Sequence, residues 1–223
     1  HVAVPLHNLA SLYNVQGLYS KAEPLFKRAL AIKEKTFGAH HLVTANSLNS
    51  LASHYHDQAL YIIAETIYQR ALAIREKMLG ADHPDTASSL NNLASLYSDQ
   101  GFYSKSESFY KRALAIREKT LGAEHQDTAE SLGNLALLYY EEGLYSKAEP
   151  LSQRALLIIE RVLGSDHPKT AVYLHNLGIN YYSQGLYGKA EPLYLRALVI
   201  NEKALGADHP DTASSLNSLA GLY

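Results

Sequence analysis

The sequence predicts an all-α fold, an α–α superhelix of about eleven helices arranged in antiparallel pairs. Three observations predict it. Features of the sequence return every 42 residues, each repeat holds two stretches with the apolar spacing of a helix, and small residues recur at fixed places. A single helix pair of this size cannot bury its own apolar face, whereas stacked pairs share a continuous core.

Histidine marks the repeat most clearly. The same 42-residue step relates two sets of tyrosines and a set of Arg-Ala-Leu triplets, a register that chance would not keep. The marking histidines are His41, His83, His125, His167 and His209. We therefore predict a single array over 1–223, with repeats at about 1–40, 41–82, 83–124, 125–166 and 167–208 and a partial repeat at 209–223. The pattern begins and ends in mid-repeat, so we expect this chain to be part of a longer protein.

The first half of each repeat predicts an amphipathic helix. In the third repeat Leu90, Leu93, Ala94 and Tyr97 follow i, i+3, i+4 and i+7 spacing, which places them on one face. Gly101 is expected to end this helix. One position on it always holds a small residue: Ala10, Ala52, Ala94, Ala136, Gly178 and Ala220. Small side chains let helices approach closely, and a larger one is expected to cost about 1–3 kcal/mol by overpacking.

The second half predicts a longer helix with its own start and stop signals. Ser and Glu stand three residues apart, as in a capping box, at Ser20/Glu23, Ser104/Glu107 and Ser146/Glu149. Prolines are expected in the first turn of these helices, where a missing N–H costs little, at Pro24, Pro150 and Pro192. Gly122 is typical of a C-terminal cap.

The linker between repeats raises a question of chemistry, because LGADHPDTASSLN occurs identically at 79–91 and 205–217. Asp82, His83 and Asp85 resemble a metal site or an acid–base pair. A stable metal site normally needs four well-placed ligands, however, and these three stand on a predicted exposed turn. We therefore predict no metal and no catalytic residue.

A structural joint explains the linker better. Where the motif changes, to HLVT at 41–44 and HQDT at 125–128, His and Thr persist while Pro and Asp vary. Gly80 is expected to take the left-handed conformation that ends a helix, and Pro84 suits the first position of the next one. The histidines are expected to have a packing or capping role.

These residues resemble the tetratricopeptide repeat. Its signature is L-x-x-L-[AG]-x-x-Y, then G-x-Y, a small residue, an aromatic residue or Leu, and Ala. The usual period is about 34 residues, and the additional residues here lengthen the second helix and add the HPDT linker. The longer form, with L-N-N-L-A-x-L-Y, R-A-L-x-I-R-E-K-x-L-G and D-H-P-D-x-A, is similar to the repeat of kinesin light chains and their bacterial relatives. The cysteine-free, near-verbatim copies look most like the bacterial proteins.

The resemblance covers the whole chain, and it implies both an arrangement and a role. It implies a right-handed superhelix whose first helices line a concave groove, and binding of a protein or peptide segment in that groove without catalysis. Asparagine side chains there would hydrogen-bond the backbone of an extended peptide, since an amide both donates and accepts. The predicted groove residues are Asn8, Asn49, Asn91, Asn92, Ser95, Asp99, Asn134, Tyr140, Glu141, Asn176 and Tyr182. Asparagines that merely tolerate an exposed helix position are the alternative.

The charges of the predicted helices suggest which partner the groove prefers. All 20 Lys and Arg lie on second helices except Lys169, which we place in a linker, whereas the first helices carry acidic residues. The basic residues with which kinesin light chains take tryptophan-acidic peptides are not met on these first helices. We therefore predict a neutral or basic partner segment in preference to an acidic one. Basic residues near the ends of second helices are expected to reach the groove rim at most: Arg75, Lys77, Arg117 and Lys119.

The second repeat departs from the pattern. Ala59 replaces a glycine, Ile62 and Ile63 replace Ser-Lys, and His54 and His56 flank Tyr55. This is either drift in a tolerant repeat or a partner contact, since exposed isoleucines can mark interfaces.

Composition and missing motifs narrow the function classes. The net charge of −2 predicts no attraction to nucleic acid or to a membrane surface. No apolar run is long enough to span a membrane, and the absence of cysteine fits a cytoplasmic protein. No phosphate-loop, nucleophile-elbow or metalloprotease motif is present, so we predict no enzyme and no cofactor. The alternatives to a peptide-binding scaffold are an array that self-associates end to end, through Leu216, Leu219 and Leu222, and the sensor part of a larger signalling protein.

Overall fold

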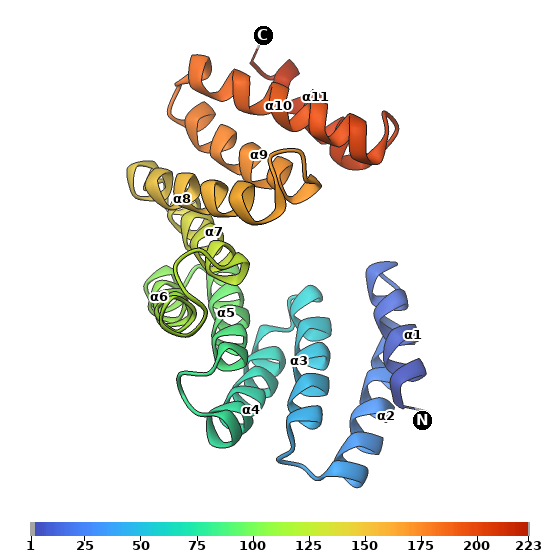
Figure 1. Ribbon diagram of the computed structural model, residues 1–223. Helices are drawn as coiled ribbons and strands as arrows, with labels where there is room; N and C mark the ends of the chain where they lie inside the picture. Colours follow the sequence, from blue (N-terminus) through green and yellow to red (C-terminus); the bar gives the residue numbers. More distant parts are fainter. Residues whose placement is uncertain (1–2, 223) are drawn as a thin grey trace. The chain divides into compact units, whose positions relative to one another are not determined.

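The computed structural model describes residues 3–222, which form eleven helices and no strand (Figure 1). The predicted all-α class of antiparallel helix pairs is confirmed. The helices are α1 (Ala3–Val15), α2 (Tyr19–Phe37), α3 (Leu42–Asp57), α4 (Tyr61–Leu79), α5 (Pro84–Asp99), α6 (Tyr103–Leu121), α7 (Gln126–Glu141), α8 (Tyr145–Leu163), α9 (Pro168–Ser183), α10 (Tyr187–Leu205) and α11 (Pro210–Ala220). Odd-numbered helices are the predicted first helices of the repeats, and even-numbered ones are the second helices.

The chain divides into two compact units, His1–Ile116 and Arg117–Tyr223, called here the N-terminal and C-terminal units. In the N-terminal unit α1 packs on α2, α2 on α3, α3 on α4 and α4 on α5, and the first helices α3 and α5 also contact each other. In the C-terminal unit α7 to α11 follow the same order, with a contact between α7 and α9. One continuous array over 1–223 stays a prediction.

The small residues lie where neighbouring helices meet. Ala10, Ala52 and Ala94 are fully buried, as the repeat predicted. Gly178 replaces alanine at this position in the C-terminal unit, and a Cβ there would stand 2.5 Å from a ring carbon of Tyr194. In that repeat, therefore, the ring of Tyr194 occupies the space that the methyl group of an alanine would take.

The predicted capping boxes are wrong. The second helices begin at Tyr19, Tyr103 and Tyr145, one residue before the serine of each box, and no side chain caps α2 or α8. The glutamates of two boxes bond between helices instead: the hydroxyl of Tyr55 donates to Glu23 at 2.8 Å, and that of Tyr181 donates to Glu149 at 2.9 Å. In these two repeats the glutamate of the predicted capping box therefore contacts a neighbouring helix and does not cap its own.

The prolines also lie deeper than predicted. Because α2, α8 and α10 begin at tyrosine, Pro24, Pro150 and Pro192 stand inside the helix in its second turn. All three are exposed. Lys169 is a further correction, since α9 begins at Pro168 and the lysine lies in its first turn.

Glycines end the second helices in a conformation other than the one expected. Gly80 has φ 97° and ψ 161°, which is extended backbone with positive φ and not the left-handed helix. Only glycine adopts this region readily. Leu219 differs from expectation as well: it is buried within the C-terminal unit, so of the three leucines proposed for self-association only Leu216 is markedly exposed.

Candidate protein-binding site

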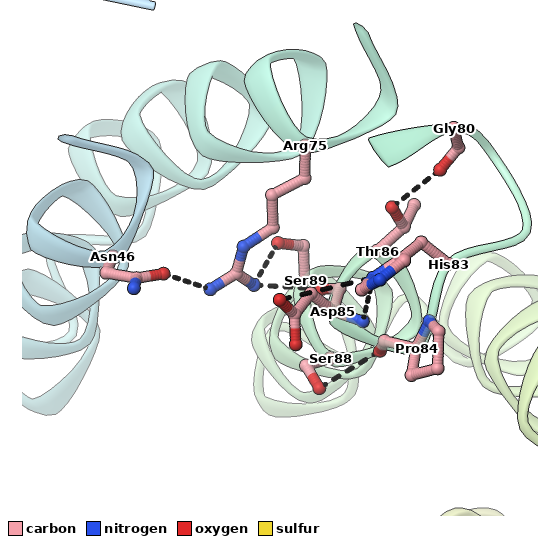
Figure 2. A network of polar contacts seen from close by, with 9 residues as sticks. All are labelled: Asn46, Arg75, Gly80, His83, Pro84, Asp85, Thr86, Ser88 and Ser89. Carbon is pink, nitrogen blue, oxygen red and sulfur yellow. Dashed lines mark hydrogen bonds and ion pairs between the residues drawn. The ribbon is translucent and has the colours of Figure 1, made fainter. Parts of the chain in front are cut away.

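The joint between repeats shows what its persistent residues do. Nδ1 of His83 accepts a hydrogen bond from the backbone N–H of Asp85 at 3.1 Å, so the imidazole caps α5 (Figure 2). The hydroxyl of Thr86 donates to the carbonyl of Gly80, the residue that ended the preceding helix, at 2.9 Å. His83 therefore caps the start of α5, while Thr86 connects α5 to the end of α4.

The same two hydrogen bonds occur in all five joints. The capping histidines are His41, His83, His125, His167 and His209. The threonines are Thr44, Thr86, Thr128, Thr170 and Thr212, each fully buried and bonded to the glycine six residues earlier. The predicted capping role is confirmed, and Pro and Asp vary because neither bond uses their side chains. No group of three His, Cys, Asp or Glu able to hold a metal ion occurs within residues 3–222.

Arg75 connects three helices beside this joint. Its guanidinium donates to the Asp85 carbonyl at 2.9 Å and to Ser89 at 2.7 Å on α5, and to Asn46 on α3 at 2.9 Å (Figure 2). Burial lowers the pKa of Arg75. Arg117 makes the corresponding bonds to the Asp127 carbonyl and Ser131 in the C-terminal unit.

The prediction that these arginines line the groove rim is therefore wrong. Arg75 is 8% exposed and Arg117 is 3% exposed, because serines on the following first helix accept their guanidinium groups. Lys77 and Lys119 are exposed.

The predicted groove residues differ in accessibility. Asn8, Asp99, Glu141, Asn176 and Tyr182 are exposed, and Asn49, Asn92, Ser95, Asn134 and Tyr140 are half-buried. Asn91 is only 6% exposed, so it does not belong to an open surface. Successive residues of a helix point about 100° apart, and only one of Asn91 and Asn92 can face outward.

Two of these side chains, Asp99 and Tyr140, take part in hydrogen bonds between neighbouring first helices. In the N-terminal unit the amide of Asn14 donates to Asp57 at 2.6 Å, and Nε2 of His56 donates to Asp99 at 2.6 Å. In the C-terminal unit Tyr140 and Ser183 share a hydrogen bond of 3.1 Å. Each partner lies 43 residues further along the chain, so the bond joins the same end of two successive first helices.

A hollow of about 510 Å³ lies over α3, α4 and α5 and is called here the N-terminal hollow. Its lining combines predicted and unpredicted residues: Ser53, His56, Asp57, Ala59, Tyr61, Tyr68, Asn92, Ser95 and Asp99. The two tyrosines were missed, because Tyr61 served only to mark the 42-residue repeat and no sequence pattern singled out Tyr68. Burial raises the pKa of Tyr68 to about 12, against the opposite effect of a hydrogen bond with Ser53, so its hydroxyl stays neutral at physiological pH.

A second hollow, called here the C-terminal hollow, is smaller and more apolar. Its volume is about 60 Å³, and its lining is Gly133, Ala136, Leu137, Tyr140, Ser152, Asn176, Ile179 and Asn180. Leu137 and Ile179 occupy the repeat position that Ser53 and Ser95 hold in the N-terminal unit. The same helical position therefore presents hydroxyls in one unit and aliphatic groups in the other.

His54 turns out to be a core residue. It is fully buried, its Nδ1 stands 2.6 Å from the carbonyl oxygen of the Asn14 amide, and the amide nitrogen of Gln58 stands 2.9 Å from its Nε2. The first partner can only accept and the second only donate, so the ring is neutral with its proton on Nδ1. Burial lowers the pKa of His54. Ile62 and Ile63 are 83% and 45% exposed, and a partner contact there stays a hypothesis.

Comparison with known proteins decides the family. The tetratricopeptide repeat model matches residues 1–77, 44–119, 85–156, 127–200 and 181–223, which together span the chain. The chain belongs to the tetratricopeptide repeat family. Repeats of this family form scaffolds for protein–protein interaction. No curated protein matches this tetratricopeptide repeat chain significantly.

Solved structures place this tetratricopeptide repeat chain beside kinesin light chain-like proteins. One, from Podosopora anserina, is assigned as a kinesin light chain with nearly identical repeats; it is 27% identical, has a TM-score of 0.72, and the match covers 92% of this chain and 98% of that one. BtubC (BKLC) from P. vanneervenii is 25% identical with a TM-score of 0.75, over 92% and 81%. A Rap protein complexed with competence and sporulation factor has a TM-score of 0.74 at 18% identity, over 97% and 63%, which shows the fold alone. No helix within residues 3–222 of this repeat chain is long and apolar enough to cross a membrane.

Proposed function

We propose that the chain is a non-catalytic scaffold that binds an extended segment of a partner protein along the outward faces of its first helices. The single observation that carries the proposal is the position of the two hollows. The N-terminal hollow contains the predicted residues Asn92, Ser95 and Asp99, and the C-terminal hollow contains Tyr140 and Asn176. Amides and hydroxyls at these positions offer both donors and acceptors to a peptide backbone.

The side chains of the second helices support the same assignment. Their charged residues join successive second helices in ion pairs, as Arg70 does with Glu34 at 2.6 Å and Arg112 with Glu76 at 2.7 Å. The first helices carry their exposed polar groups without such a ladder of basic residues. We therefore place the partner on the first helices, and we expect a neutral or basic segment, in a cytoplasmic setting and without a cofactor.

A selection from a random peptide library, followed by fluorescence anisotropy with the enriched peptides, tests this function. Asn92→Arg places a long charged side chain at the hollow and is expected to weaken binding at least about tenfold. Ala73→Arg introduces the same side chain at an exposed position of the second helix α4, in the same unit, and is expected to leave binding unchanged. Equal effects of the two substitutions, or enrichment of no peptide, would contradict the proposal.

A further inference from the structure

We propose that the N-terminal hollow seats the cationic end of a lysine or arginine side chain of the partner segment. The inference rests on the proposed function and names the chemistry that this part of the surface selects. Three observations carry it: the fixed orientation of two carboxylates, the aromatic rings beside them, and the volume and polarity of the hollow.

The two carboxylates are held in place by donors from the preceding first helix. Asn14 donates to Oδ2 of Asp57, and His56 donates to Oδ2 of Asp99. Within the described part of the chain, no hydrogen bond or ion pair holds Oδ1 of either aspartate. Asp57 is exposed, and the side chain of Asp99 is 50% exposed. Each carboxylate therefore keeps an accessible acceptor oxygen in a fixed place, and an ammonium or guanidinium group supplies donors that match it.

Aromatic rings provide the remaining walls. The centroid of the His56 ring lies 5.9 Å from that of Tyr61 and 6.3 Å from that of Tyr68, so the three rings form one cluster at the hollow. A cation over a tyrosine face is attracted by the ring quadrupole, and the stem of a lysine or arginine packs against the ring itself. Tyr68 is only 3% exposed and lies behind the other two rings, so the half-buried rings of His56 and Tyr61 are the ones that a long basic side chain can contact.

The hollow has the volume and polarity that such a group needs. Its volume of about 510 Å³ falls within the range of small-molecule sites, about 300–1,000 Å³. Its lining includes two aspartates and no Lys or Arg. A bound cation would therefore meet negative charge without a competing lysine or arginine of this protein at the site.

The C-terminal hollow offers a contrast within the same molecule. Leu137 and Ile179 line it, its volume is about 60 Å³, and no aspartate contributes to it. Burying an unpaired charge against such groups is costly. Glu141 occupies the repeat position of Asp57 and Asp99, but it does not line this hollow. The control for lost negative charge therefore uses Glu202 and Asp208, two exposed carboxylates of the C-terminal unit that line neither hollow.

The experiment uses the full chain and two small probes. Nα-acetyl-arginine N-methylamide is titrated into isotope-labelled protein and followed by NMR, with the citrulline analogue as a neutral probe of nearly equal shape. We expect the arginine probe to shift resonances of residues at the N-terminal hollow, and citrulline to leave them in place. The double substitution Asp57→Asn/Asp99→Asn is expected to weaken arginine binding at least about tenfold, since it removes two charge-assisted hydrogen bonds. The double substitution Glu202→Gln/Asp208→Asn, which removes two exposed negative charges away from the hollow, is expected to leave binding unchanged.

The same variants are then tested with peptides selected on the wild-type chain. Replacing the basic residue of such a peptide by citrulline or acetyl-lysine is expected to weaken binding to wild type and not to the double variant. If peptides bind but neither the peptide charge nor the aspartates matter, the inference is overturned while the proposed function stands. If the arginine probe binds the hollow and no peptide binds, the proposed function fails and the cation site remains. Equal losses for the Glu202/Asp208 variant and the aspartate variant would indicate a general effect of net charge and overturn the inference.

Discussion

The two compact units build the same scaffold and present different surfaces on it. Both use a histidine cap and a threonine bond at every joint, and both bury alanines where helices meet. The N-terminal unit lines its hollow with Ser53, Ser95 and two aspartates, whereas the C-terminal unit uses Leu137 and Ile179. The difference teaches that the repeat constrains positions between helices and leaves outward positions open to select a partner.

The largest expected effect comes from the hydrogen bonds of the buried Arg75, which not every repeat contains. Arg75→Ala removes a buried guanidinium and leaves the fully buried hydroxyl of Ser89 and the part-buried carbonyl of Asp85 without this donor. Each buried polar group left unsatisfied costs about 1–3 kcal/mol, so we expect the free energy of unfolding to fall by about 2–4 kcal/mol. Ile159 occupies the same repeat position in the C-terminal unit, which shows that the fold tolerates an apolar solution there.

Hydrogen exchange locates this loss. Protection is expected to fall in α3, α4 and α5 while α9 and α10 keep theirs. Lys77→Ala, an exposed neighbour on the same helix, is the control and is expected to change stability by less than about 0.5 kcal/mol. A loss below this value for Arg75→Ala would show that the network contributes little.

The joints predict an effect of intermediate size that is equal in both units. Thr86→Val and Thr170→Val keep the side-chain shape but remove the hydroxyl donor from the carbonyl of the preceding glycine, which keeps only a long bond of 3.4 Å from the histidine N–H. We expect each to lower the free energy of unfolding by about 1–2 kcal/mol, measured by urea denaturation. Very different losses at the two sites would contradict the account of a common joint.

A pair of opposite substitutions tests the second repeat. Ala59 has φ 56°, where the other repeats have glycine, for example Gly101 with φ 76°. Alanine pays a steric cost in this region, about 1–2 kcal/mol, so Ala59→Gly is expected to raise the free energy of unfolding by about 0.5–1 kcal/mol. Gly101→Ala is expected to lower it by about 1 kcal/mol. If Ala59→Gly destabilises the chain, the exposed segment at Ile62 holds this turn in place by a contact of its own.

The smallest effect at neutral pH comes from His54, and it grows in acid. Its pKa is lowered in the folded protein because burial outweighs the carboxylates of Glu23 and Asp57, which act in the opposite direction. The unfolded imidazole titrates near pH ~6.5 and takes up a proton first, so stability is full above that pH and falls towards the lowered folded pKa. His54→Leu, the residue at this position in the third and fourth repeats, is expected to flatten the decline, measured as melting temperature against pH. An unchanged slope would assign the acid sensitivity to other groups.

The sequence was sufficient for the fold because each repeat carries the same few constraints five times. The persistence of His83 and Thr86 in every repeat indicated the joint, and the spacing of Leu90, Leu93 and Ala94 indicated the core. Contacts between repeats were harder to predict, since Ser20 and Glu23 satisfy a local capping pattern while the glutamate bonds a tyrosine 32 residues away.

The surface was predicted only in part. Asn92 and Asn176, which were predicted to line a groove, lie at the hollows, and their part in binding stays a prediction. Asn91, by contrast, is buried, and Arg75 lies between helices. Side chains one residue apart on a helix face different environments, and the sequence does not say which neighbour each one meets. The tyrosines of the N-terminal hollow escaped notice for the same reason.

The most direct test of the central claim is hydrogen exchange of the full chain with and without a selected peptide. We predict that added protection falls on the first helices, in α3 and α5 around the N-terminal hollow and in α7 and α9 around the C-terminal hollow. Protection confined to the second helices, with the first helices unchanged, would contradict the account.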